Sequence, residues 1–371
     1  MAAQFNLDIW SLSYYKRSMR FIGSVIEKLQ RHPKRVVFPE GNEPRIIQAA
    51  RQYYSLRLGV PILLGSRTEI KDSAHRLNVP LDGVRILDPI DADELELFQN
   101  ILFDIRKAKG MTQEEARTTM LRPSYFGAMM AATNRADCII SGASEEAESL
   151  LRPLFQVIDV VPHRKTASSC MILELENAAF GNKGVLFMAD CAVIPEPTET
   201  QLAHIAVSTA ELASNLLGET PKVAMLSYST LSSSSSGSVT KVKNATELAR
   251  KLAHDQGLDA DFDGELQLDS AIVPFVADTK APKSMVAGKA NVLIFPDLNS
   301  GNIASKLAQH LGRSNAYGQI ILGLNRAAAD VSRGSNSHDI LGVSAIAGLL
   351  SNQLTSAYPK ALKLTSKDLK S

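Results

Sequence analysis

The sequence predicts an α/β protein with two domains, and three observations support this prediction. Short apolar runs alternate throughout the 371 residues with segments whose apolar residues recur at helical spacing. Some of these runs, such as 292–295 and 320–324, are almost continuously apolar, which is typical of strands covered on both faces. The length exceeds what one small core needs. We therefore expect two α/β domains with a cleft between them.

The first half of the chain reads as strands and helices in turn. An amphipathic helix is expected at 21–34, because Phe21, Val25 and Leu29 share one helical face. Thr112 and Glu115 form a capping box, which predicts a helix start at that point. The other elements expected here are strands at 35–38, 60–65, 84–89 and 137–142, and helices at 43–58 and at 92–109, the last closed by Gly110.

The second half of the chain keeps this alternation but opens differently. The segments 168–177 and 184–193 flank a Gly-Asn-Lys-Gly turn, which indicates an antiparallel hairpin at the start of the second domain. Further expected elements are helices at 198–217 and 239–254, strands at 222–229, 262–268, 291–297 and 319–324, and a final helix from about Ser337 through 350.

Composition and charge exclude several classes of protein. Lys and Arg total 40 and Asp and Glu total 39, so the chain lacks the basic surplus of a nucleic-acid-binding protein. We find no apolar run long enough to cross a bilayer and no secretory signal at the N-terminus, so no membrane partner is expected. The basic residues between 17 and 35 are interpreted as a surface helix rather than a transit peptide.

The three cysteines indicate a reducing compartment. Cys138, Cys170 and Cys191 are odd in number and widely spaced, which does not suit a disulfide framework. Each lies in an apolar, strand-like context, so we interpret all three as buried, unreactive thiols rather than nucleophiles. Together with the missing signal, this predicts a cytoplasmic protein.

No common cofactor or metal motif is present. The chain has no phosphate-binding P-loop, no dinucleotide fingerprint after a strand, no nucleophile elbow and no His or Cys pair with metal-ligand spacing. We therefore expect no metal and no resident cofactor. The serine run at 232–236 has two interpretations, a flexible surface loop or a loop that meets a phosphate at the next helix N-terminus, and we favour the first.

Several segments that follow the predicted strands match one protein family. They are VVFPEGNEPRIIQAA, IRKAKGMTQEEAR, YFGAMM, SGA followed by LLRPLFQVI, FMADCAV, PKVAMLSYST, KAPKSMVAGKANVLIFPDLNSGN and GLNRAAADVSRGSNSHDI. Together they resemble the phosphate acetyltransferases of the wider phosphate acetyl/butyryl transferase family. The resemblance extends from about Phe21 to Leu350. The combination is specific, whereas no single segment except the Ser-Arg-Gly segment would be specific by itself.

The resemblance implies a fold, a reaction and an assembly. The fold is two α/β domains related to the isocitrate and isopropylmalate dehydrogenases, with residues 1–164 plus 319–371 in the first domain and 165–318 in the second. The reaction is acetyl phosphate + CoA ⇌ acetyl-CoA + phosphate, in which CoA is a substrate and no metal takes part. The family resemblance also implies a homodimer.

The resemblance assigns five site residues. The Ser-Arg-Gly motif falls on Ser332 and Arg333, the aspartate base on Asp339, and two further catalytic arginines on Arg106 and Arg152. The chemistry of these residue types agrees, because guanidinium groups bind phosphoryl oxygens bidentately and stay charged. One arginine and the serine hydroxyl can also stabilise an oxyanion. With no covalent nucleophile evident, direct attack by the CoA thiolate in a ternary complex is the simplest route.

Each assignment has a plainer alternative. An arginine after a helix is usually a solvated charge, and an aspartate such as Asp339 near a helix start commonly acts as a cap. The chain also departs from the family pattern, since Glu145 and Glu146 replace neutral or His/Thr-type residues after Ser-Gly-Ala. Before the Ser-Arg-Gly motif the family often has Pro, Asn and Asp, and here Ala327, Ala329 and Asp330 occupy that stretch.

Three other functions compete with acetyl transfer. Butyryl or propionyl transfer differs only in the pocket that receives the acyl group. A non-catalytic acetyl-CoA-sensing homologue would keep the fold, although the retained Ser332, Arg333 and Asp339 favour catalysis. A metal-dependent dehydrogenase on the same fold is disfavoured because no cofactor fingerprint is recognisable.

Overall fold

A computed structural model describes residues 20–162, 164–312 and 314–359, which fall into two compact units. Within these ranges, unit 1 comprises residues 20–159 and 324–359, and unit 2 comprises 160–323. The chain passes between units at Val160 and Gly323, near the predicted boundaries at residues 165 and 318. The expectations for residues 1–19 lie outside the described residues. The basic segment 20–35 is described and forms helix α2 (Arg20–Gln30) and the start of strand β1 (Lys34–Phe38), so the helix expected at 21–34 ends earlier.

Unit 1 is built on five parallel strands in the order β3-β2-β1-β4-β11. All strands of a parallel set end at the same edge, so the segments that follow β1, β4 and β11 come together there. The strands are β1 (Lys34–Phe38), β2 (Gly59–Leu64), β3 (Arg85–Leu87), β4 (Cys138–Ser141) and β11 (Ala327–Asp330).

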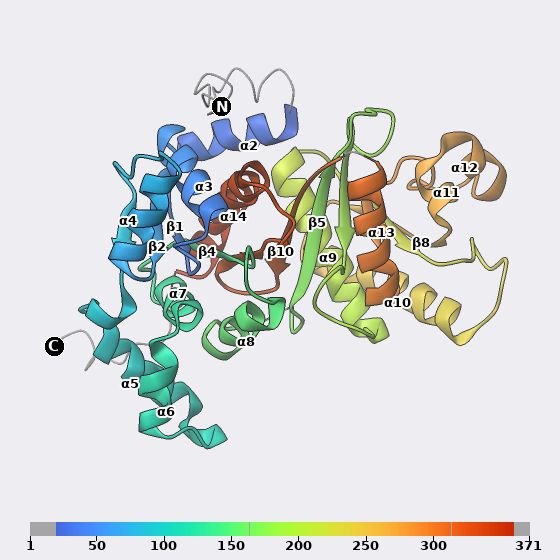
Figure 1. Cartoon of the computed structure of the whole chain (residues 1–371). Helices are drawn as coiled ribbons and strands as arrows, with labels where there is room; N and C mark the ends of the chain where they lie inside the picture. Colours follow the sequence, from blue (N-terminus) through green and yellow to red (C-terminus); the bar gives the residue numbers. More distant parts are fainter. Residues whose placement is uncertain (1–19, 163, 313, 360–371) are drawn as a thin grey trace. The chain divides into compact units, whose positions relative to one another are not determined.

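Helices cover both faces of the unit 1 strands. On one face α2, α3 and α14 pack together, and on the other α5, α7 and α8 do so (Figure 1). Gly110 ends the segment after α5 with φ of 89°, as expected for a helix-closing glycine. The helices are α2 (Arg20–Gln30), α3 (Pro44–Ser55), α4 (Arg67–Arg76), α5 (Leu95–Arg106), α6 (Gln113–Met120), α7 (Pro123–Ala132), α8 (Ala147–Val157) and α14 (Ser337–Ala357), with short 3₁₀ helices at Pro89–Asp91 and Lys107–Lys109.

The C-terminal helix α14 is the central helix of unit 1. Among the described residues it alone is long and apolar enough to cross a membrane, which the sequence analysis did not anticipate. However, most of it is buried, and it contacts α2, α3 and the strands β1, β4 and β11. Its apolar character therefore reflects its place in a protein core.

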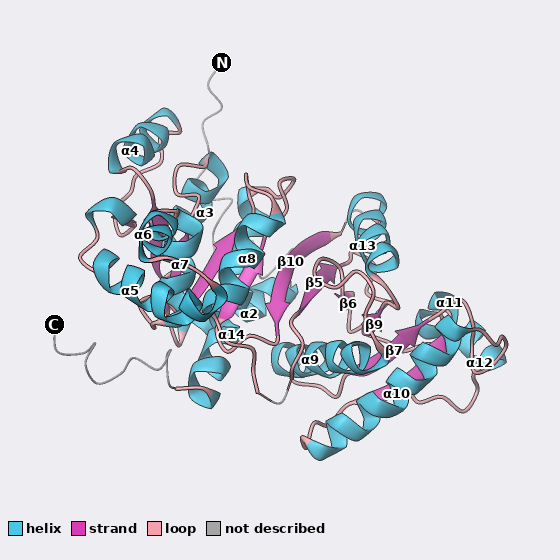
Figure 2. Ribbon diagram, turned by 90° about the horizontal axis from the view of Figure 1, so that it is seen from below, coloured by secondary structure: helices cyan, strands magenta, loops and turns pink. Residues whose placement is uncertain are grey.

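Unit 2 combines an antiparallel part with a parallel part. Strands β10, β5 and β6 are successive antiparallel neighbours, and β6, β9, β7 and β8 continue as parallel neighbours (Figure 2). The β5–β6 pair is the hairpin predicted from the glycine-containing turn. The strands are β5 (Ser168–Glu174), β6 (Val185–Ala189), β7 (Lys222–Leu226), β8 (Asp261–Leu266), β9 (Val292–Ile294) and β10 (Asn315–Leu322).

Helices also cover the strands of unit 2. The long helices α9 and α10 pack side by side, and apolar residues of β5, β6, β7 and β9 form a core with Ala277, Ala287 and other small side chains. The helices are α9 (Glu199–Leu217), α10 (Gly237–Asp255), α11 (Leu268–Ile272), α12 (Pro274–Lys280) and α13 (Leu298–Leu311). All three cysteines are free and buried, as predicted, and burial raises the pKa of Cys191 to about 12.

Strand β11 was missed by the sequence analysis. Its sequence, Ala-Ala-Ala-Asp, carries no β-branched or aromatic residue, so its composition does not favour a strand. Parallel pairing with β4, from Ala327 opposite Cys138 to Asp330 opposite Ser141, makes it one. All four of its residues are buried.

Candidate active site

The Ser-Arg-Gly segment lies directly after β11, at the edge where the parallel strands of unit 1 end. It forms a tight turn in which the Ser335 N–H donates to the Ser332 carbonyl (2.8 Å) and the Ser332 N–H donates to the Ser335 hydroxyl (3.1 Å). The Gly334 N–H donates to the Ser332 Oγ at 3.2 Å, which leaves the Ser332 hydroxyl hydrogen available for another acceptor. Arg333 is exposed, and its guanidinium has no ion-pair partner among the described residues.

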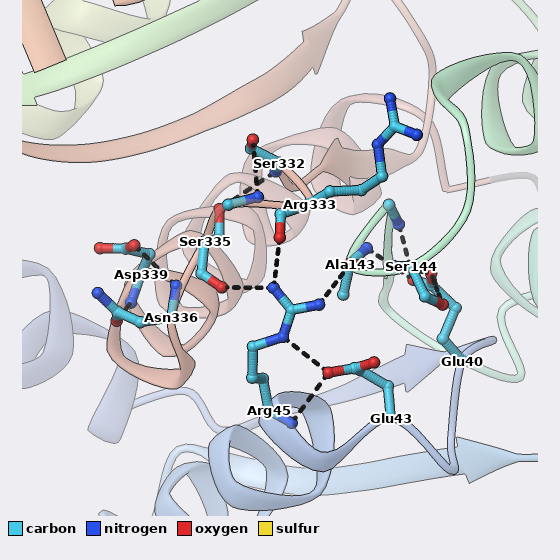
Figure 3. A network of polar contacts seen from close by, with 12 residues as sticks. Glu40, Glu43, Arg45, Ala143, Ser144, Ser332, Arg333, Ser335, Asn336 and Asp339 are labelled. Atoms are coloured by element: carbon cyan, nitrogen blue, oxygen red, sulfur yellow. Dashed lines mark hydrogen bonds and ion pairs between the residues drawn. The ribbon is translucent and has the colours of Figure 1, made fainter. Parts of the chain in front are cut away.

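Asp339 acts as a helix cap in this structure. The side chain of Asn336 accepts the N–H of Asp339 at 2.9 Å, and the Asp339 carboxylate accepts the N–H of Asn336 at 3.0 Å, which is a capping box at the start of α14. Asp339 is only 8% exposed, and burial raises the pKa of its carboxyl. In Figure 3 its carboxylate and the Arg333 guanidinium project away from each other.

A buried carboxylate holds the loop that follows β4. Glu40 comes after β1 and accepts hydrogen bonds from the main-chain N–H groups of Gly142, Ala143, Ser144 and Glu145, at 2.6–3.0 Å. Burial alone raises the pKa of Glu40, but the hydrogen bonds from Ser144, Glu145 and Ala143 outweigh this effect and hold it below its usual value. The N–H groups of this loop are therefore occupied by the protein's own carboxylate.

Arg45 holds the other side of the same region (Figure 3). Its Nη1 donates to the main-chain carbonyls of Arg333 (2.6 Å) and Ser335 (2.8 Å), and its Nη2 donates to the carbonyl of Ala143 (2.5 Å). Its Nε pairs with Glu43, the N-cap of α3, at 2.7 Å. One guanidinium thus joins the start of α3 to the loops that follow β4 and β11.

The two other predicted arginines both influence Tyr125. Burial raises the pKa of the Tyr125 hydroxyl, and the positive charges of Arg152, Arg122 and Arg106 oppose that rise. The three residues, here called the arginine cluster, therefore lie near enough to Tyr125 to act on it electrostatically; Arg106 ends α5 and Arg152 lies within α8. Arg152 pairs with Glu148, and the Nε of Arg106 is buried with no hydrogen-bond partner.

A cavity of about 400 Å³ lies beside this arginine cluster. Arg122, Tyr125 and Arg152 line it from one side, and Glu145 and Glu146 also line it. Burial, and then the charge of Glu40, raise the pKa of Glu145. The two glutamates that depart from the family pattern thus lie at the cavity, where they oppose an anionic ligand when ionised.

Asp330 is a buried acid at the end of β11. Burial, and then the charge of Glu40, raise its pKa to about 7, and its Oδ1 has no hydrogen-bond partner. It packs against Gly142, whose φ of 101° and missing side chain let the two strand ends approach. A Cβ at residue 142 would come within 2.1 Å of the Asp330 Oδ1.

The structure brings the predicted residues together in two groups within unit 1. Ser332, Arg333 and Asp339 share one loop and the helix start after it, whereas Arg106 and Arg152 belong to the cluster around Tyr125. Sequence reasoning missed Glu40, Arg45 and Arg122. The first two lie in the segment VVFPEGNEPRIIQAA, where a charged residue directly after a strand was the available signal. No group of residues suited to a metal ion occurs within the described ranges.

Comparison with known proteins gives one consistent result. A family model described as phosphate acetyl/butaryl transferase matches residues 20–348. A phosphate acetyltransferase of Thermoanaerobacterium thermosaccharolyticum is 44% identical over 325 residues, which cover 88% of this chain and 97% of the relative. The solved structure of a phosphotransacetylase from Streptococcus pyogenes superposes with a TM-score of 0.82 and 37% identity, covering 91% of this chain and 99% of that one.

A more distant structure bears on the fold alone. A protein described as a 4-hydroxythreonine-4-phosphate dehydrogenase from Salmonella typhimurium is 12% identical and superposes with a TM-score of 0.51 over 86% of this chain and 99% of its own. This likeness agrees with the predicted relation to a dehydrogenase fold.

Proposed function

Because the chain belongs to the phosphate acetyl/butaryl transferase family, we propose that it transfers an acetyl group reversibly between acetyl phosphate and CoA. In the proposed reaction both substrates are bound and the CoA sulfur attacks the carbonyl carbon of acetyl phosphate. The bond from that carbon to the phosphate oxygen then breaks, and inorganic phosphate leaves. The observation that carries the proposal is an Arg333 guanidinium that pairs with none of the described residues and lies on a loop whose main chain is held by hydrogen bonds.

Arg333 and Ser332 act on the reacting carbonyl and the phosphoryl group. The carbonyl oxygen gains negative charge as sulfur attacks, and a fixed guanidinium stabilises that charge more than the neutral ground state. The Ser332 hydroxyl donates to the same oxygen or to a phosphoryl oxygen, because its hydrogen is not used within the turn. Both residues lie at the edge where α/β proteins bind ligands.

The arginine cluster at Tyr125 binds phosphate groups of the substrates. CoA and acetyl phosphate are both polyanions, and Arg106, Arg122 and Arg152 together supply three permanent positive charges. When substrate binds, Arg152 releases the exposed Glu148 carboxylate and binds a phosphate oxygen instead. The doubly charged phosphate group attracts the guanidinium more strongly than the singly charged carboxylate does. Arg122 extends the pair of arginines that the sequence analysis assigned.

Asp339 takes the proton of the CoA thiol. A thiol of pKa near 8.5 and a carboxylate near 3.9 differ by about 4–5 pKa units, or ~6 kcal/mol, so complete transfer before attack is costly. Burial raises the pKa of Asp339, which narrows this gap, and transfer concerted with attack avoids a free thiolate.

An acyl-transfer assay with purified protein tests the proposal. Arsenate-dependent breakdown of acetyl-, propionyl- and butyryl-CoA is measured with a chelator and no added metal. We expect breakdown of acetyl-CoA at the highest kcat/KM. A preference for butyryl- or propionyl-CoA would establish the longer-chain activity instead, and binding of acetyl-CoA without turnover would identify a sensor.

Arg333→Ala provides the matching test of the site. Removing a charge contact made in the transition state should lower kcat by about a hundredfold or more. Arg117→Ala is the control, because Arg117 is also exposed and pairs only with Glu114 on its own helix. A kcat within about threefold of wild type for Arg333→Ala would exclude Arg333 from the chemistry.

We also propose that the enzyme is a cytoplasmic homodimer. Three free, buried cysteines suit a reducing compartment. Helix α13 is the observation that supports a dimer. Its residues Ile303, Leu307 and Leu311 form an apolar stripe, and their exposed fractions are 59%, 52% and 78%. An apolar stripe of this kind is typical of an interface between subunits.

A further inference from the structure

The Arg45 guanidinium is almost fully engaged, with three main-chain carbonyls and the Glu43 carboxylate. A guanidinium has five N–H groups, and four of the hydrogen bonds described for Arg45 run to Glu43, Ala143, Arg333 and Ser335. Its charge is paired with Glu43, so it offers little net attraction to an anionic substrate. Arg45 therefore differs from Arg333, which presents its guanidinium to solvent.

We propose that Arg45 is a positioning residue that aims Arg333, and this inference rests on the proposed acetyl transfer. Its Nη1 donates to the carbonyl of Arg333 itself and to that of Ser335, so the peptide planes 333–334 and 335–336 are held in orientation. The Arg333 side chain is attached to this segment, so the fixed main chain sets the direction in which its guanidinium points.

The same guanidinium joins two parts of the site. Its Nη2 holds the carbonyl of Ala143, two residues before Glu145 at the wall of the arginine cavity. Glu40 accepts hydrogen bonds from the N–H groups of the same loop. The loop is thus fixed by Arg45 at a carbonyl and by Glu40 at its N–H groups. Arg45 thereby keeps the Ser-Arg-Gly turn in a constant position relative to the loop beside the cavity.

The geometry requires arginine specifically. The contacts of Arg45 run to three segments of chain in different directions, and the planar guanidinium has donors on all of its edges. A lysine ammonium has three donors at one point and cannot span the same acceptors. We therefore expect Arg45→Lys to recover only part of the function.

The test compares Arg45→Gln and Arg45→Lys with the control Arg51→Gln. Arg51 lies on the same helix and also donates to a main-chain carbonyl, that of Asp82, at 2.7 Å, but far along the helix from the turn. Steady-state kinetics give kcat and both KM values, and hydrogen exchange measures the amides of 142–145 and 333–336. Thermal melts report whether each variant is folded.

We expect Arg45→Gln to lower kcat by about a hundredfold, the cost of displacing a catalytic group by about 1 Å, with each KM within about threefold. In Arg45→Gln, amide exchange in both loops should accelerate. The kcat and exchange rates of Arg45→Lys should lie between those of wild type and Arg45→Gln, and those of Arg51→Gln should match wild type. An unchanged kcat with unchanged exchange would overturn the proposal, and so would a tenfold rise in KM at full kcat, which identifies direct substrate binding. If amide exchange accelerates in Arg45→Gln but the wild-type protein shows no acetyl transfer, the proposed acetyl transfer is refuted instead.

Discussion

Asp339 has one observed role, as the cap of α14, and one proposed role, as the general base. Its carboxylate accepts the Asn336 N–H and thereby caps α14. Burial raises the pKa of this carboxyl, and a carboxylate with a raised pKa is a better general base. A capping residue contributes about 1 kcal/mol of stability, whereas a base contributes to the rate alone. The two roles are therefore separable by one conservative substitution.

Asp339→Asn should keep the cap and lose the base. Asparagine accepts the same N–H, so the melting temperature should change little. We expect kcat for CoA acetylation to fall by about a hundredfold to ten-thousandfold at neutral pH. The loss should shrink as pH approaches the thiol pKa near 8.5, because solution then supplies thiolate. Measuring kcat from pH 6.5 to 9 beside a melt checks this, and a near-wild-type rate across the range would leave Asp339 as a cap only.

At the scale of elements, the ends of β1, β4 and β11 bring several charged groups into a small volume. Glu40 is ionised, because its hydrogen bonds from Ser144, Glu145 and Ala143 outweigh the cost of burial. Asp330 lies nearby without a partner for its Oδ1, and its pKa is raised to about 7. Pairing of β11 with β4 places this second carboxyl beside the first.

Asp330→Asn should stabilise the protein at high pH and not at low pH. An acid whose folded pKa exceeds its unfolded value of 3.8 favours folding while protonated, and this contribution is lost as pH rises from about 4 to about 7. The shift corresponds to about 4 kcal/mol. Asparagine has the same shape and never ionises, so the variant should melt at a higher temperature than wild type at pH 8. Melts at pH 4.5 should differ far less, and an equal difference at both pH values would contradict the raised pKa.

At the scale of the whole molecule, the apolar stripe of α13 is exposed to solvent in the single chain. Only Gly301 and Ser305 of this helix are buried, and its apolar residues at positions 303, 307 and 311 recur every four residues along one face. Burial of such a face in a second copy of the chain would remove it from water.

Leu307→Lys should therefore dissociate the proposed homodimer. Sedimentation velocity should give a dimer for the wild type and a lower mass for the variant, because a charge in an apolar interface costs several kcal/mol. Leu248→Lys is the control, since Leu248 is 36% exposed on α10 and outside the stripe. A monomeric wild type, or a Leu307→Lys variant as dimeric as the control, would refute this interface.

Local features of the chain were predictable from the sequence because their causes are local. The capping box at Thr112 and Glu115, the alternation of strands and helices apart from β11, and the burial of the three cysteines all follow from patterns within a few residues. The same holds for the β5–β6 hairpin, whose connection, residues 175–184, ends in the Gly-Asn-Lys-Gly turn. The resemblance of the Ser-Arg-Gly segment likewise lies within a single stretch of sequence.

Tertiary structure alone decided the features that depend on distant residues. The alanine-rich β11 is a strand only because β4 pairs with it. Arg45 reaches the carbonyl of Arg333, which lies 288 residues away in the sequence, and no periodicity or motif reports such a contact. Arg106 and Arg122 lie at helix ends and Arg152 lies within α8, and all three act on Tyr125 only because α5, α7 and α8 cover the same face of the strands. Which charges are exposed, paired or buried is a property of packing, and packing is set by the whole fold.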